Sequence, residues 1–264
     1  MTTLGLMILL SALVVGMNSI VSGTLRKSSA VRNAAHADFA AESALELGKA
    51  IVLGSITLPT LDENRVRFDG TPIACELTPE FMTILKITDV AGLVDLRFSS
   101  DLVLATLLRG TTSTIASDAM LKNIRTKATS GAYVAAIDVL IAAGLPPLEA
   151  AKAAEFSTIH GRGFRLARDV TPSALAAMVS VGGTAANGVF GASPTNNVFK
   201  LEVETKTPGR MLVQSNALIN YEPSGGSHFR IQFEKRSSRR LPTTERLPGH
   251  VNAPNDTSIL CSAA

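Results

Sequence analysis

The chain has no tryptophan, only two tyrosines and only two cysteines among its 264 residues. Aromatic residues make up 5% of the sequence, charged residues 18%, and the formal net charge is only +3. Much of the basic excess lies in one short stretch, residues 235–246. Because a nucleic-acid-binding domain normally combines a basic stripe with interleaved aromatics, the sequence argues against nucleic acid as a partner.

Catalytic and metal-binding motifs are also missing. The sequence has no CxxC, HExxH or GxSxG spacing, so neither an enzyme nor a cofactor is predicted. The run HGRGF (160–164) is the most enzyme-like stretch, and we interpret it as a loop. Asp62, Glu63, Asp69 and Asp118 are carboxylates that calcium could use, but no dense acidic loop is present. No calcium site can therefore be assigned.

Charge is absent from the start of the chain, since the first charged residues are Arg26 and Lys27. As a helix, residues 1–25 would extend about 38 Å, enough to cross a hydrocarbon core of about 30 Å. A secretory signal would begin with basic residues, have a shorter apolar run and end in a small-residue cleavage site. We therefore predict that residues 1–25 are a retained transmembrane segment.

The helical pattern continues beyond this run without a proline until Pro59. Alanine, leucine and glutamate dominate it, and these residues favour helices. The sequence predicts one helix over residues 1–56, about 80 Å long, whose second half packs on a folded domain. The predicted packing positions repeat at roughly helical spacing: Val31, Ala34, Ala35, Phe39, Ala41, Leu45, Leu47 and Val52.

Strand and helix patterns alternate in blocks along the rest of the chain. Segments 198–207, 211–222 and 228–237 alternate apolar and polar residues between Pro/Gly turns, which predicts an antiparallel meander with one buried face. Most of 101–160 has a helical pattern instead. A long helix on such a sheet is an α+β fold. Residues 238–264 have little pattern and are predicted to be a flexible tail.

The two cysteines, Cys75 and Cys261, leave two readings open. They are either unrelated thiols or one disulfide that ties the C-terminal tail to the domain. A disulfide would require an oxidising compartment.

The first ten residues, MTTLGLMILL, resemble the mature N-terminus of type IV pilins and type II secretion pseudopilins, such as FTLIELMIVV. Met1 stands at the aromatic first position, and the run from Leu6 to Ile8 matches outright. The resemblance implies that a prepilin peptidase removes a short basic leader before Met1 and that the Met1 amine is methylated. It also implies that an apolar surface packs the helices in a filament: Leu4, Leu6, Ile8, Leu9, Leu13 and Val14.

The fifth residue departs from the common pattern. Most family members carry a glutamate there, thought to neutralise the N-terminal amine of a neighbouring subunit, whereas this chain has Gly5. A charge in hydrocarbon is costly unless it is paired, so a subunit without that glutamate cannot recruit the next amine in the same way. Absence of the glutamate is characteristic of the general secretion pathway protein K family, whose members sit at the filament tip.

A second set of residues is similar to that family. Its members carry a motif like DEAGKINLNTA within a large helical insertion, and TDVAGLVDLRFSS (88–100) keeps Asp89, Ala91, Gly92 and Leu96 in the expected places. A weaker copy follows from Gly163, GFRLARDVTPSALAAMVSVGG, in which, with one gap, Arg168 aligns with Arg97. In both copies we expect a short extended segment, a Ser/Thr N-cap and an apolar helix.

The resemblance implies a long helix (1–56), an α+β domain (57–87 and 176–237), a helical insertion (88–175) and the tail (238–264). It implies a minor pseudopilin that nucleates or caps the type II secretion pseudopilus. Such a subunit is anchored once in the bacterial inner membrane, with its globular part in the periplasm. The implied partners are I- and J-type minor pseudopilins, the major pseudopilin, prepilin peptidase and secreted proteins. Two alternatives stay open: a minor pilin of a type IV pilus or competence filament, and a membrane-anchored periplasmic enzyme.

Overall fold

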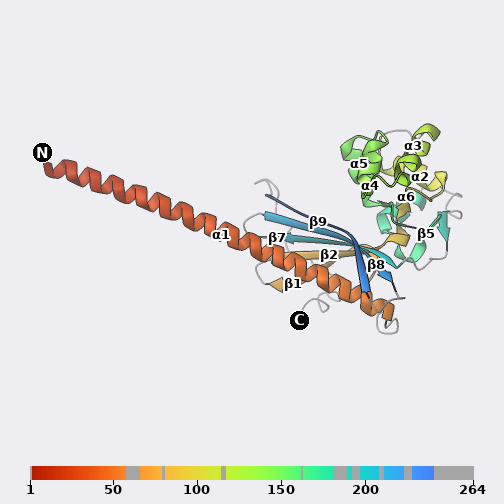
Figure 1. The fold of residues 1–264 in the computed structure, drawn as a ribbon, viewed down its shortest axis with the longest axis horizontal. Helices are drawn as coiled ribbons and strands as arrows, with labels where there is room; N and C mark the ends of the chain where they lie inside the picture. The colour runs from red at the N-terminus through yellow and green to blue at the C-terminus, as the bar shows by residue number, and fades with distance from the viewer. Residues whose placement is uncertain are drawn as a thin grey trace.

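The computed structural model describes residues 2–57, 66–78, 81–113, 117–161, 163–180, 189–191, 197–207, 211–222 and 228–240. The fold is α+β, with a long N-terminal helix, an antiparallel sheet and a group of shorter helices (Figure 1). This confirms the fold class predicted from the sequence.

The first element is the helix α1 (Thr2–Thr57), which runs without interruption for 56 residues. The prediction of one long N-terminal helix is therefore confirmed. In the part of the chain that the structure describes, no helix combines the length and hydropathy needed to cross a membrane. The side chains of residues 1–12, the first part of the predicted span, lie outside that part.

The main sheet has five strands in the order β1 (Asp69–Thr78), β2 (Phe81–Asp89), β7 (Val198–Lys206), β8 (Met211–Glu222) and β9 (His228–Arg240). All neighbouring pairs are antiparallel. The predicted meander of the last three strands is present. β9 runs past residue 237 into the predicted tail, because β8 is long enough to pair Ser238, Arg239 and Arg240. Residues 241–264 lie outside the described residues.

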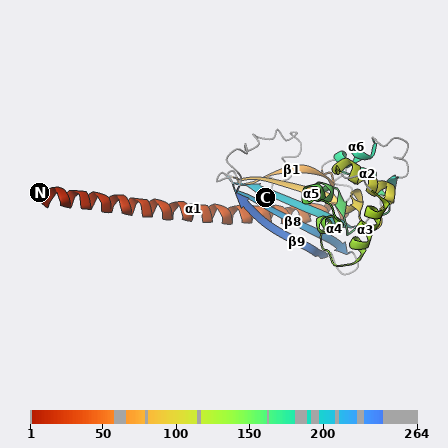
Figure 2. The same ribbon diagram turned by 90° about the horizontal axis from the view of Figure 1, so that it is seen from above.

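The second half of α1 covers one face of this sheet (Figures 1 and 2). Small residues on that side of the helix, Ala37, Ala41, Ala44 and Gly48, let its backbone approach the sheet closely. A Cβ on Gly48 would stand 3.2 Å from Leu85 Cδ1. These residues and the strands share one buried core, whose largest fully buried side chains are Leu45, Leu85, Ile87 and Leu201.

The predicted packing face of α1 is wrong at three positions. Val31, Ala35 and Phe39 are exposed, whereas Ala41, Leu45 and Val52 are buried. Phe39 lies two residues after Ala37, which turns it about 200° around the helix from the buried stripe. Val31 precedes the part of α1 that meets the sheet.

Between β2 and β7 the chain leaves the sheet and forms the insertion. It contains the helices α2 (Asp101–Thr111), α3 (Asp118–Thr129), α4 (Ala136–Ala142), α5 (Pro147–Glu155) and α6 (Ser173–Ser180). Short 3₁₀ turns η2 (Val90–Gly92) and η3 (Arg168–Val170) and two parallel strand pairs join them. The pairs are β3 (Val94–Asp95) with β4 (Ser157–Thr158), and β5 (Leu166–Ala167) with β6 (Phe190–Gly191).

The insertion has a core of its own, separate from the core between α1 and the sheet. Leu175 and Val179 of α6, together with Val189, belong to that core. The insertion therefore extends past residue 175, where the sequence places its end, to β6. A domain boundary at residue 175 would divide α6 and would separate most of that helix from α2, against which it packs. At its start, β2 continues to Asp89, two residues beyond the predicted boundary.

Candidate functional site

The first half of α1 projects from the folded body (Figure 1). From residue 13 to residue 32 almost every described side chain is exposed, including Leu13 at 53% and Val14 at 58%. Further exposed apolar residues follow over most of the helix surface, with the small residues Gly16, Ser19 and Gly23 on the remaining side: Val15, Met17, Ile20, Val21 and Leu25. A helix that is apolar all round is found in a membrane or in the core of an assembly. This projecting half is the first candidate site.

Most of the residues predicted to act in filament assembly lie at the start of α1. Leu13 and Val14 are in the projecting half, as described above. Met1 lies outside the described residues, and so do the side chains of Leu4, Leu6, Ile8 and Leu9. Gly5 belongs to α1.

Cys75 of β1 is buried and disulfide-bonded. Cys261, the other cysteine of the sequence, lies outside the described residues. Of the two readings left open, that of unrelated thiols does not hold for Cys75, and its pairing with Cys261 stays a prediction.

The motif residues of the insertion sit where the insertion joins the sheet. Asp89 ends β2, and its Oδ1 accepts the backbone N–H of Ala91 at 2.8 Å, which caps η2. Burial raises the pKa of Asp89 to about 6, and the hydrogen bond from Ala91 opposes that rise. Gly92 packs on the second motif copy so closely that a Cβ there would stand 2.1 Å from the Val170 carbonyl oxygen. The motif thus fixes the two copies against each other.

The two copies have the same spacing in the structure. β3 and α2 begin at Val94 and Asp101, and β5 and α6 begin at Leu166 and Ser173. Without any gap, Val103 then corresponds to Leu175 and Leu107 to Val179, and all four are buried. This replaces the gapped alignment of Arg97 with Arg168. The N-cap expected in the first copy is confirmed, since Ser100 Oγ accepts the backbone N–H of Val103.

The HGRGF loop lies beside a buried carboxylate of the first copy. Asp95 is only 2% exposed, and its Oδ1 accepts the backbone N–H of Arg97 at 2.8 Å. Arg97 in turn donates to the Gly161 carbonyl oxygen at 2.8 Å. Burial raises the pKa of Asp95, against the hydrogen bonds and charge of Arg97. Gly161 leaves room for the carboxylate, because a Cβ there would stand 2.7 Å from Asp95 Oδ2.

Among the described residues, His160 of the same loop hydrogen-bonds to the backbone just before α4 and not to a nucleophilic side chain. Its Nε2 donates to the Val134 carbonyl oxygen at 3.0 Å. Burial is the main cause that lowers the pKa of His160, and the Arg97 charge adds to it. These contacts hold the loop in place, which supports the interpretation of HGRGF as structural.

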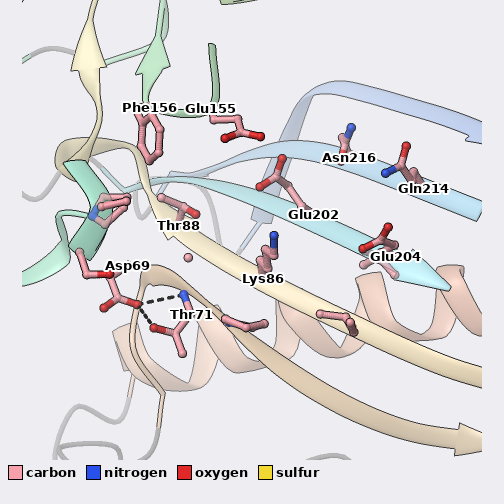
Figure 3. Close-up of a pocket in the computed structure, with 17 residues that line it drawn as sticks. Asp69, Thr71, Lys86, Thr88, Glu155, Phe156, Glu202, Glu204, Gln214 and Asn216 are labelled. Atoms are coloured by element: carbon pink, nitrogen blue, oxygen red, sulfur yellow. Dashed lines mark hydrogen bonds between the residues drawn. The ribbon is translucent and has the colours of Figure 1, made fainter. Parts of the chain in front are cut away.

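A second candidate site is the cleft between the open face of the sheet and the insertion (Figure 3). It has a volume of about 470 Å³, and a neighbouring hollow of about 340 Å³ continues along the same face. Residues paired across four strands form one polar row on this face: Lys86, Glu202, Asn216 and Lys235. Glu155 and Phe156 overhang it from the end of α5.

The cleft offers mixed charges rather than a reactive group. Lys200 and Glu202 form an ion pair at 2.9 Å, and Asp69 Oδ1 accepts the N–H and hydroxyl of Thr71. Among the described lining residues, no serine hydrogen-bonds a histidine. The alternation of β7 could have indicated Glu202 and Glu204 as open-face residues, but not that α5 would overhang them.

No group of three or more His, Cys, Asp or Glu side chains that could hold a metal is present in the described part of the chain. Of the four carboxylates considered for calcium, Asp69 pairs with Arg67 at 3.2 Å, and Asp118 begins α3. Asp62 and Glu63 lie outside the described residues. Within the described residues, the structure therefore assigns no calcium site.

Comparison with known proteins places the chain in no family: no family model matches the sequence, and no curated protein matches it either.

Proposed function

We propose that this protein is a minor pseudopilin of a type II secretion system, similar to the K type, which nucleates or caps the pseudopilus at its tip. The observation that carries the proposal is the division of α1. One half packs on an antiparallel sheet, and the other projects with exposed apolar side chains over most of its surface. Such a helix needs a second apolar environment, and a bilayer before assembly and a helix bundle afterwards would each supply it.

Three further features support the K type over a major subunit. Gly5 stands where most pilin-like subunits carry the glutamate that recruits the next subunit. The insertion adds a separately packed helical body between β2 and β7. Asp89 and Gly92 of its motif have defined roles at the junction, as a cap and as a close contact.

In this function the protein acts by assembly. The projecting half of α1 anchors the subunit in the bacterial inner membrane, and the globular part stands in the periplasm. Its partners are I- and J-type minor pseudopilins and the major pseudopilin, after processing by prepilin peptidase. Secreted proteins are candidate ligands of the exposed insertion.

The test is complementation of a strain that lacks this gene but keeps its secretion system. We would compare the wild type with Gly5→Glu and the matched control Gly5→Ala, and measure membrane association, cross-linking to sibling minor pseudopilins and secretion. We expect Gly5→Glu to stay in the membrane fraction but to lose its cross-links and most secretion, while Gly5→Ala keeps all three. Unchanged secretion after deletion of the gene would overturn the proposal.

A further inference from the structure

The insertion exposes a pair of aromatic rings on its surface. Phe98 belongs to the first motif copy and Phe164 precedes β5 in the second, and their ring centroids lie 6.2 Å apart at an angle of 67°. Phe98 is 38% exposed and Phe164 is 69% exposed. In a chain with so few aromatics, an exposed pair from two distant segments is unusual, and exposed apolar clusters of this kind mark interaction sites.

Arginines surround the pair and extend it. The Arg97 guanidinium lies over the Phe98 ring, 5.0 Å from its centroid, and the Arg168 guanidinium lies over the Phe190 ring at the same distance. Arg165 follows Phe164 in the chain, and its side chain lies beside Gly191, the neighbour of Phe190, since a Cβ on Gly191 would stand 3.0 Å from Arg165 Cδ. We call this surface the distal patch: Arg97, Phe98, Phe164, Arg165, Arg168 and Phe190.

The patch carries positive charge that the described residues do not neutralise. Arg97 is offset by the buried Asp95, at 3.6 Å. Arg165 and Arg168 are both exposed and form no ion pair with any carboxylate in the described part of the chain. Asp169, the next residue after Arg168, is an exposed carboxylate in the same segment. Elsewhere on the insertion the half-buried Arg125 pairs with Asp101 at 2.6 Å. The distal patch therefore offers an acidic partner two exposed guanidinium groups beside exposed aromatic rings.

The arrangement of the rings favours a protein over a nucleic acid. Base stacking needs open ring faces, but a guanidinium already covers one face of Phe98 and one of Phe190. An arginine held over a ring still has donors free for a carboxylate, and the ring edges can pack against aliphatic side chains.

The position of the patch suits a partner outside the membrane. β5, beside Phe164 and Arg165, lies at the end of the molecule opposite the N-terminus (Figure 1). The projecting half of α1 can therefore be buried in a bilayer or a bundle without covering it.

We propose that the distal patch is a docking surface for an acidic protein segment that carries aliphatic side chains. Its carboxylates bind Arg165 and Arg168, and its apolar side chains pack against Phe98 and Phe164. The inference does not depend on the proposed function, since the interaction is measured on this protein alone.

The experiment uses the full chain in a non-ionic detergent and a fluorescein-labelled peptide that alternates glutamate with leucine. The control ligand is the same peptide with lysine in place of glutamate, and detergent alone gives the background. Binding is measured by fluorescence anisotropy. We expect the acidic peptide to bind at least about tenfold more tightly than the basic one, and high salt to weaken it.

Variants with matched controls localise the binding. The double change Arg165→Gln and Arg168→Gln should weaken the acidic peptide about tenfold, or 1.4 kcal/mol, whereas Arg109→Gln at the exposed end of α2 should not. Phe164→Ser should weaken it severalfold, whereas Leu148→Ser on α5, equally exposed at 71%, should not. Circular dichroism of each variant checks that the fold is kept.

Four results would overturn the proposal. They are equal affinity for the two peptides, an equal loss from Arg109→Gln, tighter binding of a single-stranded oligonucleotide, and tighter binding of phosphatidylglycerol vesicles that depends on the same arginines. A concentration-dependent dimer that Phe164→Ser abolishes would point to a second copy as the occupant and would overturn it as well.

Discussion

The sheet lobe, formed by α1 and the five-stranded sheet, and the insertion each have a hydrophobic core, but they build it differently. The core of the sheet lobe combines three segments that are far apart in sequence, from α1, from β1 and β2, and from β7 and β8. The core of the insertion comes from one continuous stretch between Val94 and Val189. A small third cluster, Val90, Val198 and Leu218, lies where the two bodies meet.

This difference shows how a large segment can be inserted between two adjacent strands. β2 and β7 pair along eight residues although the whole insertion separates them in sequence. The sheet needs only that the insertion begins and ends near the same place. Because the insertion buries its own apolar surface, its folding need not be completed by the sheet.

The largest effect on stability is expected from a substitution that creates a cavity in the core of the insertion. Leu104 of α2 is fully buried, so Leu104→Ala should lower the free energy of unfolding of the insertion by about 4 kcal/mol. Leu102→Ala, at an exposed position on the same helix, is the control. Amide hydrogen exchange should accelerate in α2 and α6 and stay slow in β7 and β8. Equal loss of protection in both bodies would show that the two cores do not act separately.

The corresponding experiment creates a cavity in the core of the sheet lobe. Leu45 of α1 packs in its core, and Leu45→Ala should cost about 3 kcal/mol and accelerate exchange in β2, β7 and β8. Leu25→Ala, in the projecting half of the same helix, removes an exposed side chain and should leave those strands unchanged. A large effect of Leu25→Ala would mean that the projecting half contacts the sheet.

The close contact between the motif copies gives a third test. Gly92→Ala places a Cβ against the Val170 carbonyl, and the two backbones would have to move apart to accept it. We expect the free energy of unfolding to fall by about 1–3 kcal/mol, as measured by thermal or urea unfolding. Gly54→Ala on α1, where a Cβ would meet nothing within 4 Å, should be neutral or slightly stabilising. A neutral Gly92→Ala would remove the physical reason for glycine at the motif position.

The smallest effect concerns the junction itself. Because the pKa of Asp89 is raised in the folded state to about 6, its carboxyl binds protons more tightly when folded. Its contribution to stability is full below its unfolded pKa of 3.8 and is lost as the pH rises through about 6.

Asp89→Asn keeps an oxygen for the Ala91 N–H and removes the buried charge. We expect it to raise stability at pH 7 on the order of 1 kcal/mol and to flatten the dependence between pH 4 and 7, as read from urea unfolding. The control is Asp101→Asn, since that exposed carboxylate lies at the start of α2. If the two variants show the same pH profile, burial of Asp89 is not the cause.

Much of the fold could be predicted because local patterns were strong. The absence of proline before Pro59 and the alanine-rich repeat predicted α1, and the alternation of Leu201 and Val203 predicted β7. Local sequence patterns failed where burial depended on which other segment of the chain packs against the residue. Phe39 has the apolarity of a packing residue, but the stripe that meets the sheet is set by the small residues Ala37, Ala41 and Gly48. The end of the insertion was misplaced because α6 resembles any short apolar helix until α2 is seen beside it.

The candidate sites divide in the same way. The long uncharged run at the start of α1 can be read directly from the sequence. The cleft and the distal patch cannot, since Glu202 and Phe156, or Phe98 and Phe164, meet only after the chain has folded.

The secondary structure elements of this protein can be recognised in the amino-acid sequence: one long helix, a meander and a block of short helices. Periodicity and chain-breaking residues are local properties, and they are fixed before any tertiary contact forms. Three features are set only in the folded molecule: which side of α1 is buried, where the insertion ends and which side chains share a surface. Those outcomes depend on how closely two backbones can approach, as at Gly48 and Gly92, and that distance is a property of the packed pair rather than of either segment.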